Sequence, residues 1–177
     1  MASEIIIRTG GEADAAAVAD LHAESWRTAY AGFLPARVLG DGMADERREL
    51  WQIRLGADYG EPADTPTLLL AEGPAGELLG FCYLVPEPDG RVLLDNLHVR
   101  PGRTGLGIGG RLLRAGLAAA AGPVRLEVLQ ANTRAVAFYE REGGVRTAEG
   151  TAEFAGGVRR PEYEYSWPAG AVSGRTP

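Results

Sequence analysis

The sequence predicts an α+β domain in which a central mixed, mostly antiparallel sheet is flanked by helices. Its 177 residues, of which 45% are hydrophobic, are enough to bury one core, so we expect a single domain. Strand and helix patterns follow in the order strand, two helices, three strands, then helix, strand, helix and a closing strand pair. The three middle strands are joined by short turns, which favours antiparallel pairing over a regular alternation of strand and helix.

The first half of the chain contains one strand, two helices and the run of three strands. Ile5–Arg8 is a β-branched run ended by two glycines, which predicts the first strand. A helical pattern follows Asp14 and runs toward Tyr30, and a second helix is predicted over about 45–55. The three strands are expected at 67–72, 77–85 and 91–99.

The second half alternates between helices and strands. A helix is predicted over 108–121, a strand over 124–129 and a helix over 132–142, which a pair of glycines ends. Two late segments, at about 145–148 and 162–167, are expected to complete the sheet as a hairpin.

Composition narrows the function classes. The net charge of -6 argues against nucleic acid as a partner. The single cysteine, Cys82, excludes an internal disulfide, and His22 and His98 lack metal-ligand spacing, so no metal is expected. Because the chain shows no signal peptide and no membrane-spanning stretch, we expect a soluble cytoplasmic protein without a membrane partner. The domain is expected to cover 1–168, with 169–177 as a flexible tail.

The segment Gly105-Leu106-Gly107-Ile108-Gly109-Gly110 lies between a strand and a helix. Glycines allow close backbone approach to a ligand, and the helix start offers free N–H groups, so the segment predicts phosphate or pyrophosphate binding. A flexible turn is the plainer alternative. The segment also satisfies the dinucleotide pattern G-x-G-x-x-G, with Glu127 near the ribose-binding position. Half of the chain precedes this segment, however, and too little follows it for the required parallel strands.

Motifs in the right order and spacing resemble the signature of the GNAT superfamily of N-acetyltransferases. The likeness covers about residues 5–167. The motifs are Leu94-Asp95-Asn96-Leu97-His98-Val99-Arg100-Pro101, Gly105 to Gly109, Leu112-Leu113, Leu126-Glu127-Val128, Asn132, Ala135, Phe138-Tyr139-Glu140 and Gly143, with Leu21-His22, Ser25-Trp26, Ala29-Tyr30, Gly32 and Leu34-Pro35 near the front. The sequence departs from the family pattern at Thr104, where arginine or glutamine is usual, and at Gly144, where phenylalanine is frequent.

The resemblance implies a sheet that splays between its fourth and fifth strands and an enzyme that transfers acetyl from acetyl-CoA to a primary amine of a small molecule. The pantetheine arm would pair with the backbone of residues 97–99, where the Val99 N–H polarises the thioester carbonyl. The pyrophosphate would lie on the loop 103–110. The residues expected at the cofactor are Leu97, His98, Val99, Arg103, Thr104, Gly105, Leu106, Gly107, Ile108, Gly109, Gly110, Asn132 and Tyr139.

Two residues are expected to carry catalysis. An alkyl amine with a pKa near 10.4 arrives protonated, so a base must take its proton. By the period of two, Asp95 shares a strand face with Leu97 and Val99 and is the first candidate base; His98, facing the other way, and Glu72 are weaker candidates. Tyr139 would donate a proton to the leaving thiolate, although it could be a core aromatic.

The acceptor pocket is less defined by the sequence. Trp26, Tyr30 and Tyr83, together with Trp51, are candidates for an apolar lining or for core positions. Two functions remain beside acetyl transfer: a non-catalytic acyl-CoA-binding regulatory module and a nucleotide-cofactor oxidoreductase. A homodimer formed through sheet edges is compatible with the sequence, which contains no residue that establishes it.

Overall fold

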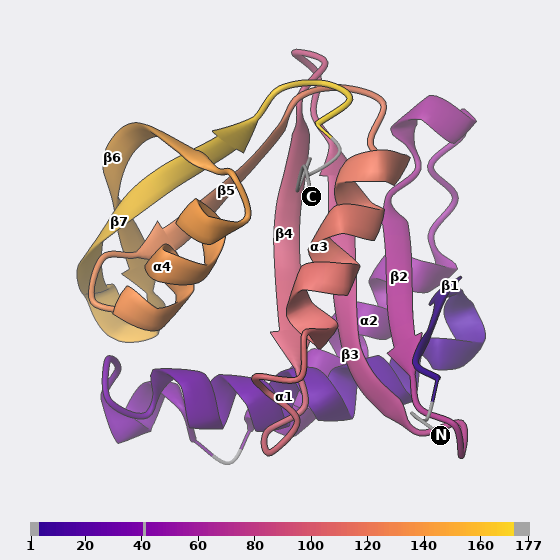
Figure 1. The fold of residues 1–177 in the computed structure, drawn as a ribbon. Coiled ribbons are helices and arrows are strands. Elements are labelled where there is room, and N and C mark those ends of the chain that lie inside the picture. The colour runs from indigo at the N-terminus through magenta and orange to yellow at the C-terminus, as the bar shows by residue number, and fades with distance from the viewer. Residues whose placement is uncertain (1–3, 41, 172–177) are drawn as a thin grey trace.

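The computed structural model describes residues 4–40 and 42–171, and the end of the expected tail, 172–177, lies outside them. Seven strands form one sheet in the order β1-β2-β3-β4-β5-β7-β6 (Figure 1). The predicted fold class is confirmed. The strands are β1 (Ile6–Thr9), β2 (Thr67–Glu72), β3 (Leu78–Pro86), β4 (Val92–Val99), β5 (Val124–Leu129), β6 (Val145–Phe154) and β7 (Val158–Trp167), and the helices are α1 (Ala15–Tyr30), α2 (Met43–Gly56), α3 (Ile108–Ala119) and α4 (Thr133–Arg141).

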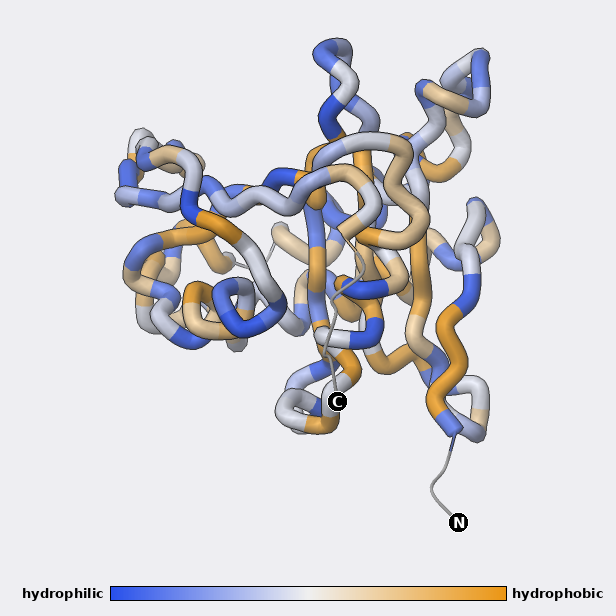
Figure 2. The backbone as a smooth tube through the Cα atoms, turned by 45° about the horizontal axis from the view of Figure 1, so that its top comes forward, coloured by the Kyte–Doolittle hydropathy of each residue, from blue (hydrophilic) through white to orange (hydrophobic). Residues whose placement is uncertain are grey.

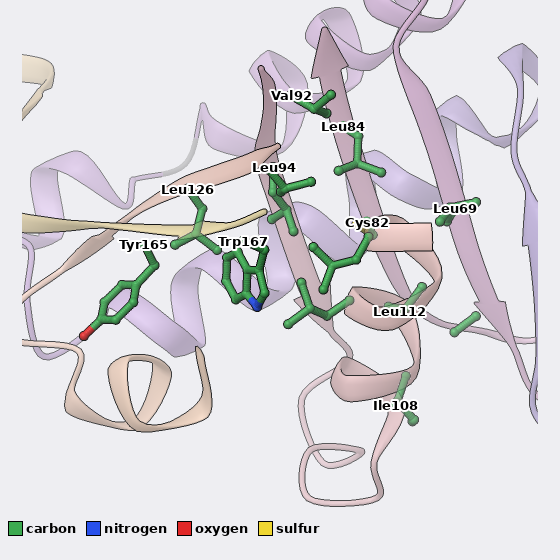
Figure 3. Packing of buried hydrophobic residues seen from close by; sticks show 14 of the residues in the cluster. Leu69, Cys82, Leu84, Val92, Leu94, Ile108, Leu112, Leu126, Tyr165 and Trp167 are labelled. Carbon is green, nitrogen blue, oxygen red and sulfur yellow. The ribbon is translucent and has the colours of Figure 1, made fainter. Parts of the chain in front are cut away.

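The sheet has a hydrophobic core on each face. Along β2, Leu69 packs into the cluster beneath α3 (Figure 3), whereas Leu68 and Leu70 pack into the cluster beneath α1 and α2. A strand covered on both faces needs no polar alternation, which explains its continuous apolar run. Burying each of these leucines contributes about 1.5–3 kcal/mol. Figure 2 shows the hydrophobic segments along the central strands and hydrophilic residues in the protruding loops.

The sheet splays between β4 and β5. These two strands are parallel, but they pair only at Val92 with Val124 and Leu93 with Arg125. Beyond this point they diverge (Figure 1), and β5 continues in antiparallel pairing with β7. The edge of β4 from Leu94 onward therefore has no partner strand on the β5 side, which leaves backbone polar groups for a ligand.

Strand β4 contains a β-bulge at Asp95. Tyr83 of β3 pairs with Asn96 and Leu84 pairs with Leu94, so Asp95 is an extra residue between them. An extra residue breaks the alternation of side chains. The expectation that Asp95 shares a face with Leu97 was therefore wrong: Leu97 packs toward the core beneath α3, whereas the Asp95 carboxylate contacts α2 on the other face.

The closing hairpin is longer than the sequence predicted. Strands β6 and β7 have ten residues each and pair over nearly their whole length, from Phe154 with Val158 to Val145 with Ser166, instead of over two short segments. The side chain of Trp167 on β7 occupies the space beside Gly144: a Cβ there would lie 2.8 Å from the indole. The indole Nε1 donates to the carbonyl of Glu142, 3.0 Å away. Trp167 thus accounts for a glycine where the family often has phenylalanine.

Candidate active site

A cleft of about 1160 Å³ opens where β4 and β5 diverge. Its walls come from α1, β4 from Leu94 onward, the loop before α3 with the first turn of that helix, the middle of β5, and α4 with the residues that follow it. These elements lie far apart in the sequence, but all of them border the gap that the splay opens between the two halves of the sheet (Figure 1). A cleft of this size and position is suited to a long ligand that passes from one face of the sheet to the other.

The loop before α3 forms a cradle of free N–H groups. Within the described residues, none of the seven backbone N–H groups from Thr104 to Gly110 donates a hydrogen bond. Gly105 and Gly107 have φ values of +84° and +77°, the left-handed region that glycine adopts without strain. Open N–H groups at the start of a helix attract anions. The cradle therefore fits the pyrophosphate predicted for it.

The free edge of β4 directs backbone groups into the cleft. The N–H of Arg100 bonds the carbonyl of Leu79 on β3, 2.8 Å away. Because hydrogen-bonded and non-bonded pairs alternate along an antiparallel ladder, the backbone groups of Leu97 and Val99 point away from β3, toward the gap. The predicted backbone contacts thus fit Leu97 and Val99. His98 instead turns its backbone toward β3 and contributes its side chain to the cleft.

Helix α4 places two predicted residues on the cleft, Asn132 and Tyr139. The Oδ1 of Asn132 accepts the N–H of Ala135 at 3.2 Å, so Asn132 caps the helix and keeps its amide NH₂ free. Burial raises the pKa of the Tyr139 phenol, with smaller contributions from Tyr30 and Cys82. The phenol therefore stays protonated near neutral pH, as a proton donor must.

A chain of four residues in polar contact, of which Trp51, His22 and Ser25 are buried and His98 is half-buried, runs from α2 to the cleft. The Trp51 indole donates to Nδ1 of His22 at 2.9 Å, and the rings of His22 and His98 lie 4.8 Å apart. Nδ1 of His98 is 2.9 Å from the hydroxyl of Ser25, which also lines the cleft. Burial lowers the pKa of His98 to about 4 and that of His22 to about 2. For His22, repulsion from His98 is the second largest cause of the lowered pKa. Both imidazoles are neutral at pH 7.

Asp95 reaches the cleft but is already bonded. Its Oδ2 accepts from Arg54 at 2.8 Å and from the Asn96 side chain at 2.8 Å. These two donors come from α2 and from the bulge itself. A proton taken up by this carboxylate would weaken both bonds, so the predicted base is less available than its position suggests.

The predicted acceptor residues separate into two groups. Tyr30 lines the cleft, and Trp26 lies behind it, with ring centroids 4.9 Å apart. Tyr83 is only 2% exposed and packs edge-on against Trp51, so both belong to the core and not to the pocket. Leu106, 61% exposed, lies outside the cleft lining, whereas the other residues expected at the cofactor line it.

Sequence reasoning missed two polar residues of the cleft, Ser25 and Asn96. Ser25 is one helical turn after His22, a spacing that places both on one face of α1, but nothing local indicates that His98 meets them there. Asn96 was obscured by the bulge, which cannot be seen in the strand pattern. Asn96 is 8% exposed and lies beside Asp95 in the cleft.

The fold and the cleft define an acyl-CoA-type transferase architecture: a splayed sheet with an anion cradle beside the gap. Comparison with known proteins agrees. The sequence model of the Acetyltransferase (GNAT) family matches residues 18–144, which is well over half of the chain. The chain therefore belongs to the GNAT acetyltransferase family, and the predicted resemblance is confirmed.

Individual relatives show the same pattern. A mycothiol acetyltransferase from Kineococcus radiotolerans is 42% identical over 111 residues, which are 61% of this chain and 35% of the relative; the match thus spans about a third of that protein. The coenzyme A complex of PaiA N-acetyltransferase from Thermoplasma acidophilum has a TM-score of 0.70 at 20% identity, covering 93% of this chain and 99% of the other. A mutant of the spermidine N-acetyltransferase SpeG from Vibrio cholerae has a TM-score of 0.70 at 16% identity, with 97% of both chains covered. The two structures show a shared fold.

The rival interpretation of the glycine loop does not fit this sheet. A dinucleotide-binding domain requires a series of parallel strands, whereas β4 and β5 are the one parallel pair in the described part of the chain. Among those same residues, no group of three or more His, Cys, Asp or Glu side chains could hold a metal ion. No helix of residues 4–40 and 42–171 has the length and apolar character needed to cross a bilayer.

Proposed function

We propose that this chain transfers acetyl from acetyl-CoA to a primary amine of a small molecule. The observation that carries the proposal is the set of seven N–H groups of residues 104–110, in the loop before α3 and the first turn of that helix, which have no partner within the described residues and lie beside the cleft between β4 and β5. The cradle offers a place for the pyrophosphate, and the free edge of β4 leads from it toward α1. Membership of the GNAT family supports acetyl transfer as the reaction.

The donor would be held mainly by backbone groups. The loop 104–110 would bind the pyrophosphate, the edge of β4 at Leu97 and Val99 would pair with the pantetheine, and the free NH₂ of Asn132 would add a side-chain contact. The thioester supplies an activated acetyl group. The Val99 N–H, directed into the gap, would stabilise negative charge that develops on the carbonyl oxygen. Holding both reactants in line contributes further to the rate.

We assign the proton acceptor to His98, with Asp95 as the alternative. Because its pKa is lowered to about 4, the imidazole is unprotonated at pH 7 and has a free lone pair. Ser25 contacts Nδ1, and when Nδ1 donates to the Ser25 hydroxyl, Nε2 carries the lone pair that can face the amine or an intervening water. Ser25 is a positioning residue in this account. The low pKa favours brief transfer through water to the solvent over storage of the proton on the ring.

Tyr139 would return a proton to the departing thiolate. Its phenol is kept protonated by burial, and within the described residues it donates no hydrogen bond that would have to be broken first. Tyr139 lines the same cleft as Asn132. Donation to the thiolate prevents the reverse attack of sulfur on the new amide.

The acceptor would be small. The α1 end of the cleft is bounded by the aromatic rings of Tyr30 and Phe33. Two relatives carry names that refer to small molecules, spermidine and mycothiol, which supports this size class.

The test is turnover of an amine panel by the purified protein with acetyl-CoA, followed by release of the thiol. The panel contains amino acids, polyamines, aminoglycosides and short peptides, and each amine is paired with its N-acetylated form as a matched blank. Thiol release that depends on the free amine, with an acetylated product of the expected mass, supports the proposal. Binding of acetyl-CoA without transfer to any of these amines would favour the regulatory module instead.

A further inference from the structure

Among residues 4–40 and 42–171, Arg47 on α2 is a cation without an anionic partner. Its guanidinium forms no ion pair and donates no hydrogen bond within the described residues. Its Nε is completely enclosed and has no hydrogen-bond partner. Enclosed charges in folded proteins are normally paired, because an unpaired one loses its hydration without compensation. Burial correspondingly lowers the pKa of this guanidinium.

The guanidinium lies behind the wall at the acceptor end of the cleft, and neither Arg47 nor Trp26 is among the residues that line the cleft itself. Its central carbon is 4.9 Å from the ring centre of Trp26, which in turn stacks beside Tyr30 in the cleft wall. The charge of Arg47 is also among the causes that lower the pKa of His98. Arg47 thus acts electrostatically on the imidazole that we propose as the acceptor of the proton from the amine. Among the described residues, its terminal nitrogens are not enclosed in the way that Nε is.

The neighbouring charges that the structure describes do not pair with Arg47. Arg54 lies further along the same helix and is itself paired with Asp95. Glu46 is adjacent in sequence and forms no ion pair with Arg47. The next residue, Arg48, pairs with Asp20 and Asp45 on the outer surface. The enclosed position holds the unpaired cation, whereas the exposed neighbour holds the paired one.

We infer that Arg47 binds the carboxylate of the acceptor, so that the substrate is an amino acid or a similar amine that carries a carboxylate. The planar guanidinium matches a carboxylate with two parallel N–H bonds, and its aromatic support on Trp26 fixes its plane. An α-amino acid places its amine and carboxylate on one carbon, so one small ligand could meet His98 and Arg47 together. The aromatic walls at Tyr30 and Phe33 favour an apolar side chain. This inference rests on the proposed function and specifies its substrate class.

The test compares carboxylates with amides in the wild type and in Arg47→Gln. The acceptors are L-methionine, L-leucine and L-phenylalanine, each with its primary amide, and kcat/KM is measured for every pair. The wild type is expected to prefer the acids, and R47Q to lose at least tenfold on the acids, mainly through KM, with little change on the amides. Dividing the effect of R47Q on the acid by its effect on the amide removes the contribution of their different amine pKa values.

Arg48→Gln is the matched control, because it removes the same charge from the neighbouring residue, which is exposed and paired with Asp20. It should leave the preference for acids unchanged. R47Q should also unfold at the same temperature as the wild type or above it, since it removes an unpaired enclosed charge; a purely structural arginine would instead destabilise the fold when replaced.

The outcomes distinguish failure of the carboxylate assignment from failure of the acetyltransferase proposal. Equal losses on acids and amides in R47Q, or a wild type that acetylates amides or diamines but no acid, would overturn the carboxylate assignment and leave the acetyltransferase proposal standing. A protein that acetylates no amine at all and does not bind acetyl-CoA would overturn the proposed function itself.

Discussion

Replacing His98 should change how stability depends on pH. Burial lowers the pKa of this imidazole to about 4 in the folded protein, whereas a histidine in the unfolded chain has a pKa near 6.5. The unfolded state therefore binds an additional proton between these values, and the stability that the neutral imidazole provides is complete above pH 6.5 and is lost as the pH falls toward 4. At about 1.4 kcal/mol per pH unit, the loss between pH 7 and pH 5 is about 2 kcal/mol.

The assay is denaturant unfolding of the wild type and of His98→Gln at pH 7, 6 and 5. The wild type should lose about 2 kcal/mol more than the variant over this range, since His22 and the carboxylates titrate in both proteins. Ser25→Ala is the matched control: it removes the 2.9 Å contact to Nδ1 but retains the buried ring, so it should keep the wild-type slope. Parallel curves for the wild type and His98→Gln would refute the buried, neutral imidazole.

Three further substitutions test other parts of the molecule. Trp51→Phe removes the donor to Nδ1 of buried His22 and should cost about 1–3 kcal/mol in unfolding free energy; an unchanged midpoint of denaturation would contradict the bond. Gly105→Ala places a Cβ at φ +84° and should cost about 1–2 kcal/mol and weaken acetyl-CoA binding in calorimetry, and unaltered affinity would argue against the cradle. Tyr139→Phe should lower kcat with little change in the Kd of acetyl-CoA; normal turnover would exclude it as the proton donor.

Most of the fold could be predicted because burial leaves a pattern in the sequence. The helices over α1 and α3 and the strands β2 to β5 begin and end within a few residues of the predicted bounds. Strands β6 and β7 were underestimated for a physical reason. The residues of β6 from Val145 to Thr151 are exposed, so no alternation of apolar and polar side chains marks the strand. Pairing along the backbone defines this hairpin, and pairing carries little sequence signal.

The same distinction holds for the candidate site, where local features were predictable and long-range contacts were not. The glycine loop and the start of α4 were predictable because local backbone requirements select glycine at Gly105 and Gly107 and a capping residue at Asn132. The surroundings of His98 were not predictable, since its contacts with Ser25 and His22 join segments more than seventy residues apart. The bulge at Asp95 is likewise a matter of register between β3 and β4.

The central claim is that the loop before α3 and the free edge of β4 bind acetyl-CoA. Calorimetric titration of the purified protein with acetyl-CoA, with NADH as the parallel ligand, tests it most directly. The account predicts saturable binding of acetyl-CoA in the micromolar range, with one molecule per chain, and no binding of NADH. Absence of acetyl-CoA binding, or binding of NADH in its place, would contradict the account.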